Sequence, residues 1–302
     1  MSNIKLIMAD IFRKTLTKIS PKLNTAIIYR VKLKRKWNEN NPVTLNEKIL
    51  WLKFHTYLNN ELVKKCADKY RVREYLIEQG LKKHLVDLLG VYDRTEDIDW
   101  DRLPKKFVMK INVGCGFNYI VFDKDKENKE EVFLTLNKWL KKAPNSYLGY
   151  SEMQYKDVKP VIIIEKFLDF GKSALPEDYK FYCINGKVEL VMACFGRDEN
   201  GHNATYVYCS PDWEFVASAK KVNVNELVKP LMLDEAIQVA EKLAKPFPFV
   251  RVDLYLSNNA VYFGELTFTP AAGMDKDHLL KPANSNEDID HIYGRKLVLP
   301  KS

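Results

Sequence analysis

Apolar residues follow helical spacing in the first third of the chain. Between residues 1 and 20 they recur with lysines between them, at Ile4, Leu6, Ile7, Ile11, Leu16 and Ile19. From Thr44 a second set recurs at helical intervals, and Glu47 stands three positions after the threonine, which is the pattern of a capping box. Residues 61–79 predict one further helix, and Gly80 is its expected end.

Beyond residue 106, short apolar runs and alternating positions replace the helical spacing. Strands are predicted at 107–111, 119–122 and 161–167, and a hairpin at 178–184 and 187–195 around Asn185-Gly186, a favoured two-residue turn. Residues 130–141 and 231–244 predict amphipathic helices, and residues 250–270 predict a last hairpin. The expected fold class is α+β, with largely antiparallel strands after a helical N-terminal region.

Composition and charge narrow the class of protein. The chain has 302 residues and is 46% apolar, which is enough for a substantial core. Its net charge is +8, but residues 1–37 contain ten Lys or Arg and one acid, so this arm carries +9 and the remainder −1. No apolar run approaches the roughly 20 residues of a membrane span. The start lacks an apolar stretch followed by a small-residue cleavage site, so we expect no secretory signal there. We expect a cytoplasmic protein with a basic N-terminal arm and no nucleic-acid partner.

The basic arm leaves two interpretations open. A helix with apolar residues and lysines could lie on an anionic membrane, which would make the protein peripheral at the inner membrane face. The same helix could instead cap the folded domain. The five cysteines form no C-x-x-C pair and accompany no His cluster, which argues against a zinc site and fits a reducing compartment.

Three fragments contain residues that could carry chemistry. In LPKKFVMKINVGCGFNYIV, Lys110 leads into a loop with Gly114 and Gly116, whose backbone could approach an anion, although a plain hairpin fits equally well. The apolar strand VIIIEKFL ends in Glu165-Lys166, which either line a cleft or simply reach solvent. In EDYKFYCINGK the aspartate and the first lysine alternate with aromatic residues, so they share one face of a strand, which a solvent-exposed face explains equally well.

The last hairpin, VRVDLYLSNNAVYFGELTFTP, carries charges inside apolar strands. A turn with an odd number of residues, such as Asn258–Ala260, would place Asp253 opposite Glu265 and Arg251 opposite Thr267. Two opposed carboxylates repel each other, and a divalent cation such as Mg²⁺ would reverse that cost. An even turn would put the two acids on opposite faces and remove the argument.

In their order along the chain, these fragments resemble the ATP-grasp superfamily. The phrases DKYRVREYL, VGCG, DYKFYCINGKV and VRVDLY…YFGELTFTPAAG are similar to the TupA-like ATP-grasp family, which is associated with teichuronopeptide and other bacterial surface polysaccharides. The resemblance covers roughly residues 45–275 and implies an ATP-grasp fold, in which two α+β subdomains grip ATP between antiparallel sheets. The implied segments are a basic arm (1–40), a helical region (41–105), a small subdomain with the glycine loop (106–168), and a large subdomain with the metal site and C-terminal tail (169–302).

The resemblance also implies a role for each matching residue. The lysines and the glycine loop would bind phosphates, the end of the apolar strand would face the adenine, and the acidic strand would meet the ribose. The nucleotide-binding residues would be Lys69, Lys110, Gly114, Gly116, Glu165, Lys166, Leu168, Asp178 and Lys180. The Mg²⁺ ligands would be Asp253, Glu265 and Thr267, and the catalytic residues Arg251 and Lys110. Many ATP-grasp enzymes have E-x-N where this chain has Thr267, which is a weaker ligand.

The activity implied by the resemblance is an ATP-dependent carboxylate–amine ligase that forms an amide through an acyl phosphate. Its expected partners are an acidic sugar of a polysaccharide precursor, such as a uronic acid, and an amine or amino acid. A kinase that phosphorylates a sugar hydroxyl would keep the same ATP site and stays open. A glycosyltransferase is a second alternative, because Asp123-Lys124-Asp125 and Asp275-Lys276-Asp277 match D-x-D, although both fit polar turns. A binding module without activity is a third.

Overall fold

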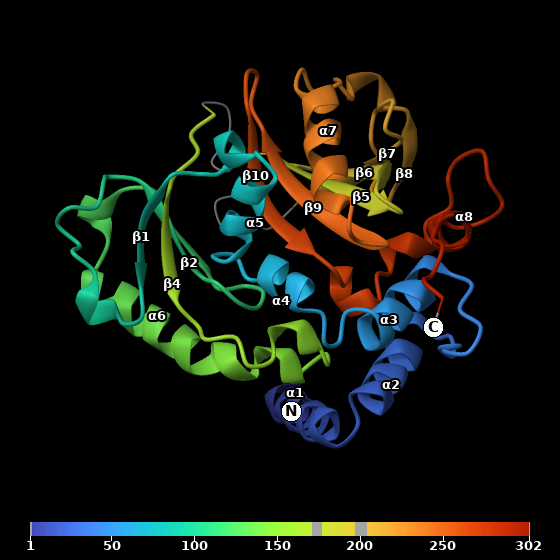
Figure 1. The fold of residues 1–302 in the computed structure, drawn as a ribbon, viewed down its shortest axis with the longest axis horizontal. Coiled ribbons are helices and arrows are strands. Elements are labelled where there is room, and N and C mark those ends of the chain that lie inside the picture. Colours follow the sequence, from blue (N-terminus) through green and yellow to red (C-terminus); the bar gives the residue numbers. More distant parts are fainter. Residues whose placement is uncertain (1, 171–176, 197–203, 302) are drawn as a thin grey trace. The chain divides into compact units, whose positions relative to one another are not determined.

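A computed structural model describes residues 2–170, 177–196 and 204–301 of the protein (Figure 1). The chain forms two compact units. The first unit comprises Met1–Asn24, Asn60–Tyr75 and Leu85–Leu168, and the second comprises Thr25–Asn59, Leu76–His84 and Asp169–Ser302. The chain therefore passes between the units several times. The segment boundaries implied by the resemblance stay predictions.

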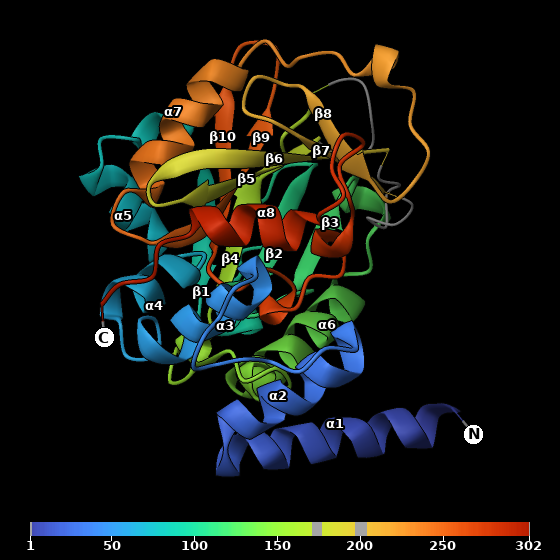
Figure 2. The ribbon, with the colours of Figure 1, turned by 90° about the vertical axis from the view of Figure 1, so that its right-hand side faces the viewer.

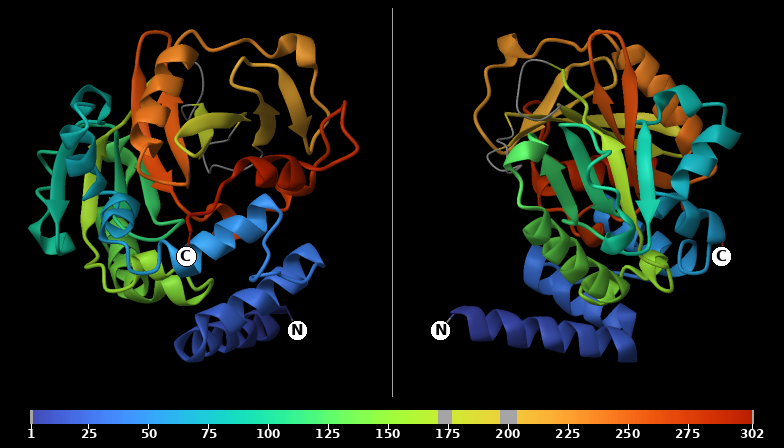
Figure 3. Two further views of the ribbon diagram at one scale, coloured as in Figure 1. Left: turned by 45° about the vertical axis from the view of Figure 1, so that its right-hand side comes forward. Right: turned by 90° about the vertical axis from the view of Figure 1, so that its left-hand side faces the viewer.

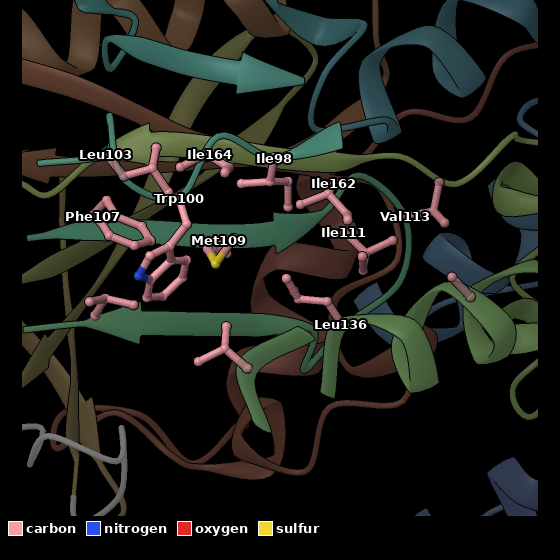
Figure 4. Close-up of a cluster of buried hydrophobic side chains, with 13 residues drawn as sticks. Ile98, Trp100, Leu103, Phe107, Met109, Ile111, Val113, Leu136, Ile162 and Ile164 are labelled. Atoms are coloured by element: carbon pink, nitrogen blue, oxygen red, sulfur yellow. The ribbon is translucent and has the colours of Figure 1, made fainter. Parts of the chain in front are cut away.

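The first unit is built on an antiparallel sheet with the strand order β1-β4-β2-β3. Its strands are β1 (Leu88–Tyr92), β2 (Phe107–Ile111), β3 (Asn118–Val121) and β4 (Ile162–Lys166). The sequence pattern predicts all of them except β1. Helix α6 (Lys129–Lys142) joins a hydrophobic cluster on one sheet face, where Figure 4 shows Leu136 close to Ile111 of β2. Lys110 and Glu165 stand at the alternate positions and therefore lie on the opposite face.

The second unit is built on an antiparallel sheet with the strand order β10-β9-β5-β6-β7-β8. Its strands are β5 (Asp178–Ile184), β6 (Lys187–Phe195), β7 (Thr205–Cys209), β8 (Phe215–Ser218), β9 (Phe249–Leu256) and β10 (Val261–Thr267). Helix α7 (Leu233–Ala244) packs on one face, where Cys183 Sγ lies 3.8 Å from the Ala240 carbonyl oxygen. Lys180 and Asp253, which pair across β5 and β9, occupy the alternate positions and lie on the other face.

Local turn chemistry explains the β5–β6 hairpin and confirms its prediction. Asn185 and Gly186 have φ values of 51° and 80°, which are the left-handed values that a two-residue turn of type I′ requires. Asn and Gly tolerate these values better than other residues do. The two strands begin and end at the residues that the sequence pattern predicts.

The remaining helices are α1 (Ser2–Ile19), α2 (Pro21–Leu33), α3 (Leu45–His55), α4 (Glu61–Ala67), α5 (Val72–Glu78) and α8 (Ile289–Lys296). The capping box of α3 is confirmed, because Thr44 accepts a hydrogen bond from the Glu47 N–H and the Glu47 carboxylate accepts one from the Thr44 N–H. None of the helices in the described ranges combines the length and apolarity that a bilayer-spanning segment needs.

The predicted single helix at 61–79 is wrong, because α4 ends before Asp68 and α5 starts at Val72. The Asp68 carboxylate accepts hydrogen bonds from the Tyr70 N–H at 2.8 Å and the Arg71 N–H at 3.1 Å. This local turn competes with the helical hydrogen bonds and divides the segment. The end near Gly80 is confirmed: that glycine has a φ of 67°.

Candidate active site

Three charged side chains meet in the first unit, on the sheet face opposite the hydrophobic cluster. Lys110 Nζ lies 2.7 Å from Glu165 Oε2, and Arg73 Nη1 lies 3.1 Å from Glu165 Oε1. Arg73 Nη2 also donates to the Val86 carbonyl oxygen at 2.9 Å, which fixes the guanidinium. One carboxylate between two cations leaves a local charge of +1. This excess favours an anionic group such as a phosphate.

The glycine loop after β2 depends on two left-handed residues. Gly114 and Gly116 have φ values of 81° and 79°, which L side chains rarely adopt. A Cβ on Gly114 would also lie 3.0 Å from the Phe117 ring. Lys69 Nζ donates to the Gly114 carbonyl oxygen at 2.8 Å, and the Lys69 N–H donates to the Asn112 carbonyl oxygen at 2.9 Å. The structure therefore brings Lys69 to the glycine loop, although the two are far apart in sequence.

The end of β4 holds the residues that the resemblance assigns to adenine. Lys166 is exposed, and its Nζ lies 3.6 Å from Asp87 Oδ2. Leu168 follows the strand and is half-buried. Both carboxylate oxygens of Glu165 are engaged in ion pairs with Lys110 and Arg73. If an adenine base binds at this stretch, backbone groups rather than the Glu165 side chain would contact it.

A longer charged network lies in the second unit, on the sheet face opposite α7. Arg251 donates two hydrogen bonds to Asp253, from Nε to Oδ1 at 2.7 Å and from Nη2 to Oδ2 at 2.7 Å. Lys180 Nζ lies 2.8 Å from Asp253 Oδ2 and also contacts the Asp178 carboxylate. The Asp253 side chain is only 5% exposed, so its charge depends on these two cations.

Thr267 and Glu265 extend the network along β10. Arg251 Nη2 donates to Thr267 Oγ1 at 3.2 Å, and Thr267 Oγ1 donates to Glu265 Oε1 at 3.1 Å. The Glu265 side chain is 39% exposed, so it forms the solvent end of the network. Three carboxylates against two cations leave a net charge of −1, which favours a bound cation.

Strands β9 and β10 run side by side (Figure 3), and their register confirms the predicted pairs, Asp253 with Glu265 and Arg251 with Thr267. The predicted odd-numbered turn is wrong, because the turn spans 257–260 and is even. The register instead shifts by one at Gly264, where a β-bulge adds a residue to β10. A Cβ on Gly264 would lie 3.0 Å from the Asp253 carbonyl oxygen, so this position favours glycine. The bulge, rather than the turn, brings the two carboxylates to one face.

Mutual neutralisation sets the ionisation of this network. Burial lowers the pKa of Lys180, but the carboxylates of Asp178 and Asp253 outweigh burial and raise it above its ordinary value. Burial likewise lowers the pKa of Arg251, and Asp253 more than offsets that effect. Burial raises the pKa of Asp253, while Arg251 and Lys180 oppose the rise. Both cations therefore remain charged at neutral pH beside Asp253.

The donor set of this face fits one divalent cation. Asp253 and Glu265 supply carboxylate oxygens and Thr267 supplies a hydroxyl, which are the hard oxygen ligands that Mg²⁺ prefers. A carboxylate offers about four acceptor positions, so the three donors on Asp253 leave room for a metal bond. Within the described part of the chain, no three His, Cys, Asp or Glu side chains gather as a metal site. A cation here would complete its shell with water or phosphate oxygens.

Three residues at these sites are absent from the predicted set: Arg73, Tyr182 and His278. Tyr182 pairs with Arg251 across β5 and β9, and extending the Asp178–Lys180 alternation by one step would have found it. His278 is fully buried, and its ring centre lies 5.5 Å from that of Tyr182. Local sequence carries no signal for His278, because this contact joins distant segments.

Both D-x-D segments form turns, as their polar composition predicts. Asp123 Oδ1 accepts a hydrogen bond from the Asp125 N–H at 3.3 Å, and Asp275 Oδ1 accepts one from the Asp277 N–H at 3.0 Å. The first aspartate of each segment therefore closes its own turn. This arrangement favours the structural interpretation over a nucleotide-sugar metal site.

Comparisons with known proteins agree with this fold. The TupA-like ATPgrasp family matches residues 47–297. An L-amino acid ligase from Bacillus licheniformis is 12% identical with a TM-score of 0.50, over 85% of this chain and 56% of that one. D-alanine–D-alanine ligases from Bacillus anthracis (19% identity, TM-score 0.41, 70% of this chain and 59% of that one) and Helicobacter pylori (16%, 0.43, 76% and 63%) also match. No curated protein matches the chain.

The similarity to the L-amino acid ligase bears on the fold alone. The chain spans less than two thirds of the length of each of these solved structures. The family match, in contrast, extends over most of the chain. The protein therefore belongs to the TupA-like ATP-grasp family.

Proposed function

We propose that the protein is an ATP-dependent carboxylate–amine ligase, which forms an amide through an acyl phosphate and releases ADP and phosphate. The observation that carries this proposal is the network around Asp253, where two opposed carboxylates and a buried arginine share one sheet face. Such a face can hold a cation and phosphate oxygens close together. Phosphoryl transfer needs little else from a protein than this positioning and charge neutralisation.

In the first step the substrate carboxylate attacks the γ-phosphorus of ATP, and the bond between that phosphorus and the ADP oxygen breaks. Lys110 and the N–H groups of the glycine loop would bind the phosphates, and Lys69 adds a positive charge at Gly114. Mg²⁺, when bound by Asp253, Glu265 and Thr267, neutralises phosphate charge.

In the second step the amine attacks the carbonyl carbon of the acyl phosphate. A C–N bond forms, the C–O bond to phosphate breaks, and the nitrogen gives up a proton. Arg251 stays cationic because Asp253 raises its pKa against the effect of burial. Its Nε and Nη2 donate to Asp253 and Thr267, which leaves Nη1 to donate to phosphate oxygens of the intermediate and of the leaving group.

For the substrates, we propose a uronic acid of a surface-polysaccharide precursor and an amine or amino acid. The association of the family with teichuronopeptide and related polymers supports this choice. The basic arm at residues 1–37, with a charge of +9, also favours an acidic or lipid-linked precursor.

ADP release, screened over pairs of uronic acids and amines, tests the proposal. In the presence of hydroxylamine an acyl phosphate gives a hydroxamate, so we expect ADP and hydroxamate together. ADP with a phosphorylated sugar and no hydroxamate would instead identify a sugar kinase. Selective binding of UDP-sugars without ATP binding, measured by calorimetry, would contradict both and favour a glycosyltransferase.

A further inference from the structure

Helix α1, the dark blue helix at the N-terminus in Figure 2, carries an exposed apolar stripe. Six large apolar side chains of this helix are 57–76% exposed: Leu6, Ile7, Met8, Ile11, Phe12 and Ile19. Successive helical residues are rotated by about 100°, so Met8, Ile11, Phe12 and Ile19 fall on one side. A surface helix of a globular protein normally buries such a stripe against the core. In α1 the apolar stripe faces outward.

The opposite side of α1 forms hydrogen bonds with the rest of the first unit. Thr17 is 2% exposed, and its hydroxyl donates to the Leu148 carbonyl oxygen at 2.7 Å and lies 2.8 Å from Ser151 Oγ. Asn24 Nδ2, just beyond the helix, donates to Thr17 Oγ1 at 2.8 Å and to Ser151 Oγ at 3.0 Å. These buried hydrogen bonds fix the rotation of the helix, so the direction of the apolar stripe is built into the fold.

Basic residues border the stripe, and the helix offers no acid beside it. By helical rotation Lys5 and Lys18, both exposed, lie at its two edges. The one acid of α1, Asp10, lies on the opposite side and is held by Lys14 Nζ at 2.7 Å and Arg13 Nη2 at 3.6 Å. The stripe therefore combines apolar side chains with uncompensated positive charge.

We infer that α1 is a peripheral membrane anchor that lies in the plane of an anionic bilayer. Ile11 and Phe12 would enter the boundary of the acyl chains, while Lys5 and Lys18 would meet the lipid headgroups. A second copy of the chain fits this stripe less well than a membrane does. In a two-fold pair of α1 helices the bordering lysines would face each other, with no acid on that side to neutralise them. Anionic headgroups supply that negative charge.

Co-sedimentation of the full-length protein with vesicles tests this inference without reference to activity. We expect binding to an equimolar mixture of phosphatidylcholine and phosphatidylglycerol, weaker binding to phosphatidylcholine alone, and a loss of binding as salt rises. Ile11→Ser with Phe12→Ser should weaken binding at least about tenfold. Lys5→Gln with Lys18→Gln should weaken it roughly tenfold or more.

Matched variants control for the loss of apolar groups and of charge elsewhere. Val228→Ser with Leu231→Ser removes two other apolar side chains, 81% and 79% exposed, and should leave binding unchanged. Lys141→Gln with Lys142→Gln, at the end of α6, should have little effect. No vesicle binding, or equal binding by the α1 variants, would overturn the inference. A dimer in sedimentation velocity that Ile11→Ser with Phe12→Ser abolishes would instead assign the stripe to a second copy.

Discussion

Replacing Asp253 by asparagine should cost the protein both stability and ATP turnover. Three donors from Arg251 and Lys180 point at the two carboxylate oxygens. The asparagine amide has only one oxygen. Its NH₂ group replaces the second carboxylate oxygen and faces a cation, so at least one of the three hydrogen bonds is lost. Removing one partner of a buried ion pair costs about 3–5 kcal/mol. Because Asp178 and Glu265 still neighbour the two cations, we expect about 3 kcal/mol, at the low end of that range.

Urea unfolding of the variant and of the parent protein measures this cost. We expect a lower midpoint with an unchanged dependence on urea, since the folded surface stays the same. Asp212→Asn, at an exposed position, is the matched control and should change stability by less than about 0.5 kcal/mol.

Glu265→Gln separates the metal role from stability. Its carboxylate is 39% exposed and lies 3.7 Å from Arg251, so its removal should cost less than about 1 kcal/mol. Turnover should nevertheless fall at least about 100-fold, because a metal ligand is lost. An Asp253→Asn variant as stable as the Asp212→Asn control would refute the energetic role of the network. Unchanged turnover in Glu265→Gln would remove this residue from the metal site.

Three further substitutions test other parts of the account. Gly264→Ala places a Cβ 3.0 Å from the Asp253 carbonyl oxygen. It should therefore lower the free energy of unfolding by about 1–3 kcal/mol and also reduce turnover. Parent-like values of both would contradict the requirement for glycine at the bulge. Lys110→Gln should weaken ATP binding about 10–100-fold in calorimetry, since a charged hydrogen bond to phosphate is lost while Glu165 keeps another cation; an unchanged Kd would exclude Lys110 from the phosphate site. Thr44→Ala removes a helix cap and should cost about 1 kcal/mol in urea unfolding with turnover unchanged; no cost would mean that the cap is dispensable.

Local chemistry made the β5–β6 hairpin and the start of α3 predictable. Asn185-Gly186 and the Thr44–Glu47 capping box each act within a few residues, so the sequence pattern contains the whole cause. Strand β1 has no such signal, since its pairing with the distant strand β4 decides its formation. Strands β7 and β8 are absent from the prediction, although each pairs with the strand next to it in the chain. The break between α4 and α5 depends on Asp68, whose side chain bonds both its own turn and Asn112.

In the site, too, local patterns were predictable and contacts between distant residues were not. Alternation places Asp178 beside Lys180 on one face, and the structure agrees. The meeting of Asp253 with Glu265 was predicted through the wrong cause, because a bulge at Gly264 has the same effect on register as an odd turn. The contact of Arg73 with Glu165 joins residues 92 positions apart, and no spacing rule reaches that far.

The most direct test of the central claim is ATP turnover with a uronic acid, Mg²⁺ and hydroxylamine. We expect hydroxamate and ADP to form in equal amounts, and both to fall at least about 100-fold with Glu265→Gln. Removal of Mg²⁺ by a chelator should abolish them as well. ADP without hydroxamate over a broad panel of carboxylates, or turnover that does not depend on Glu265, would contradict the assignment of this face to acyl phosphate chemistry.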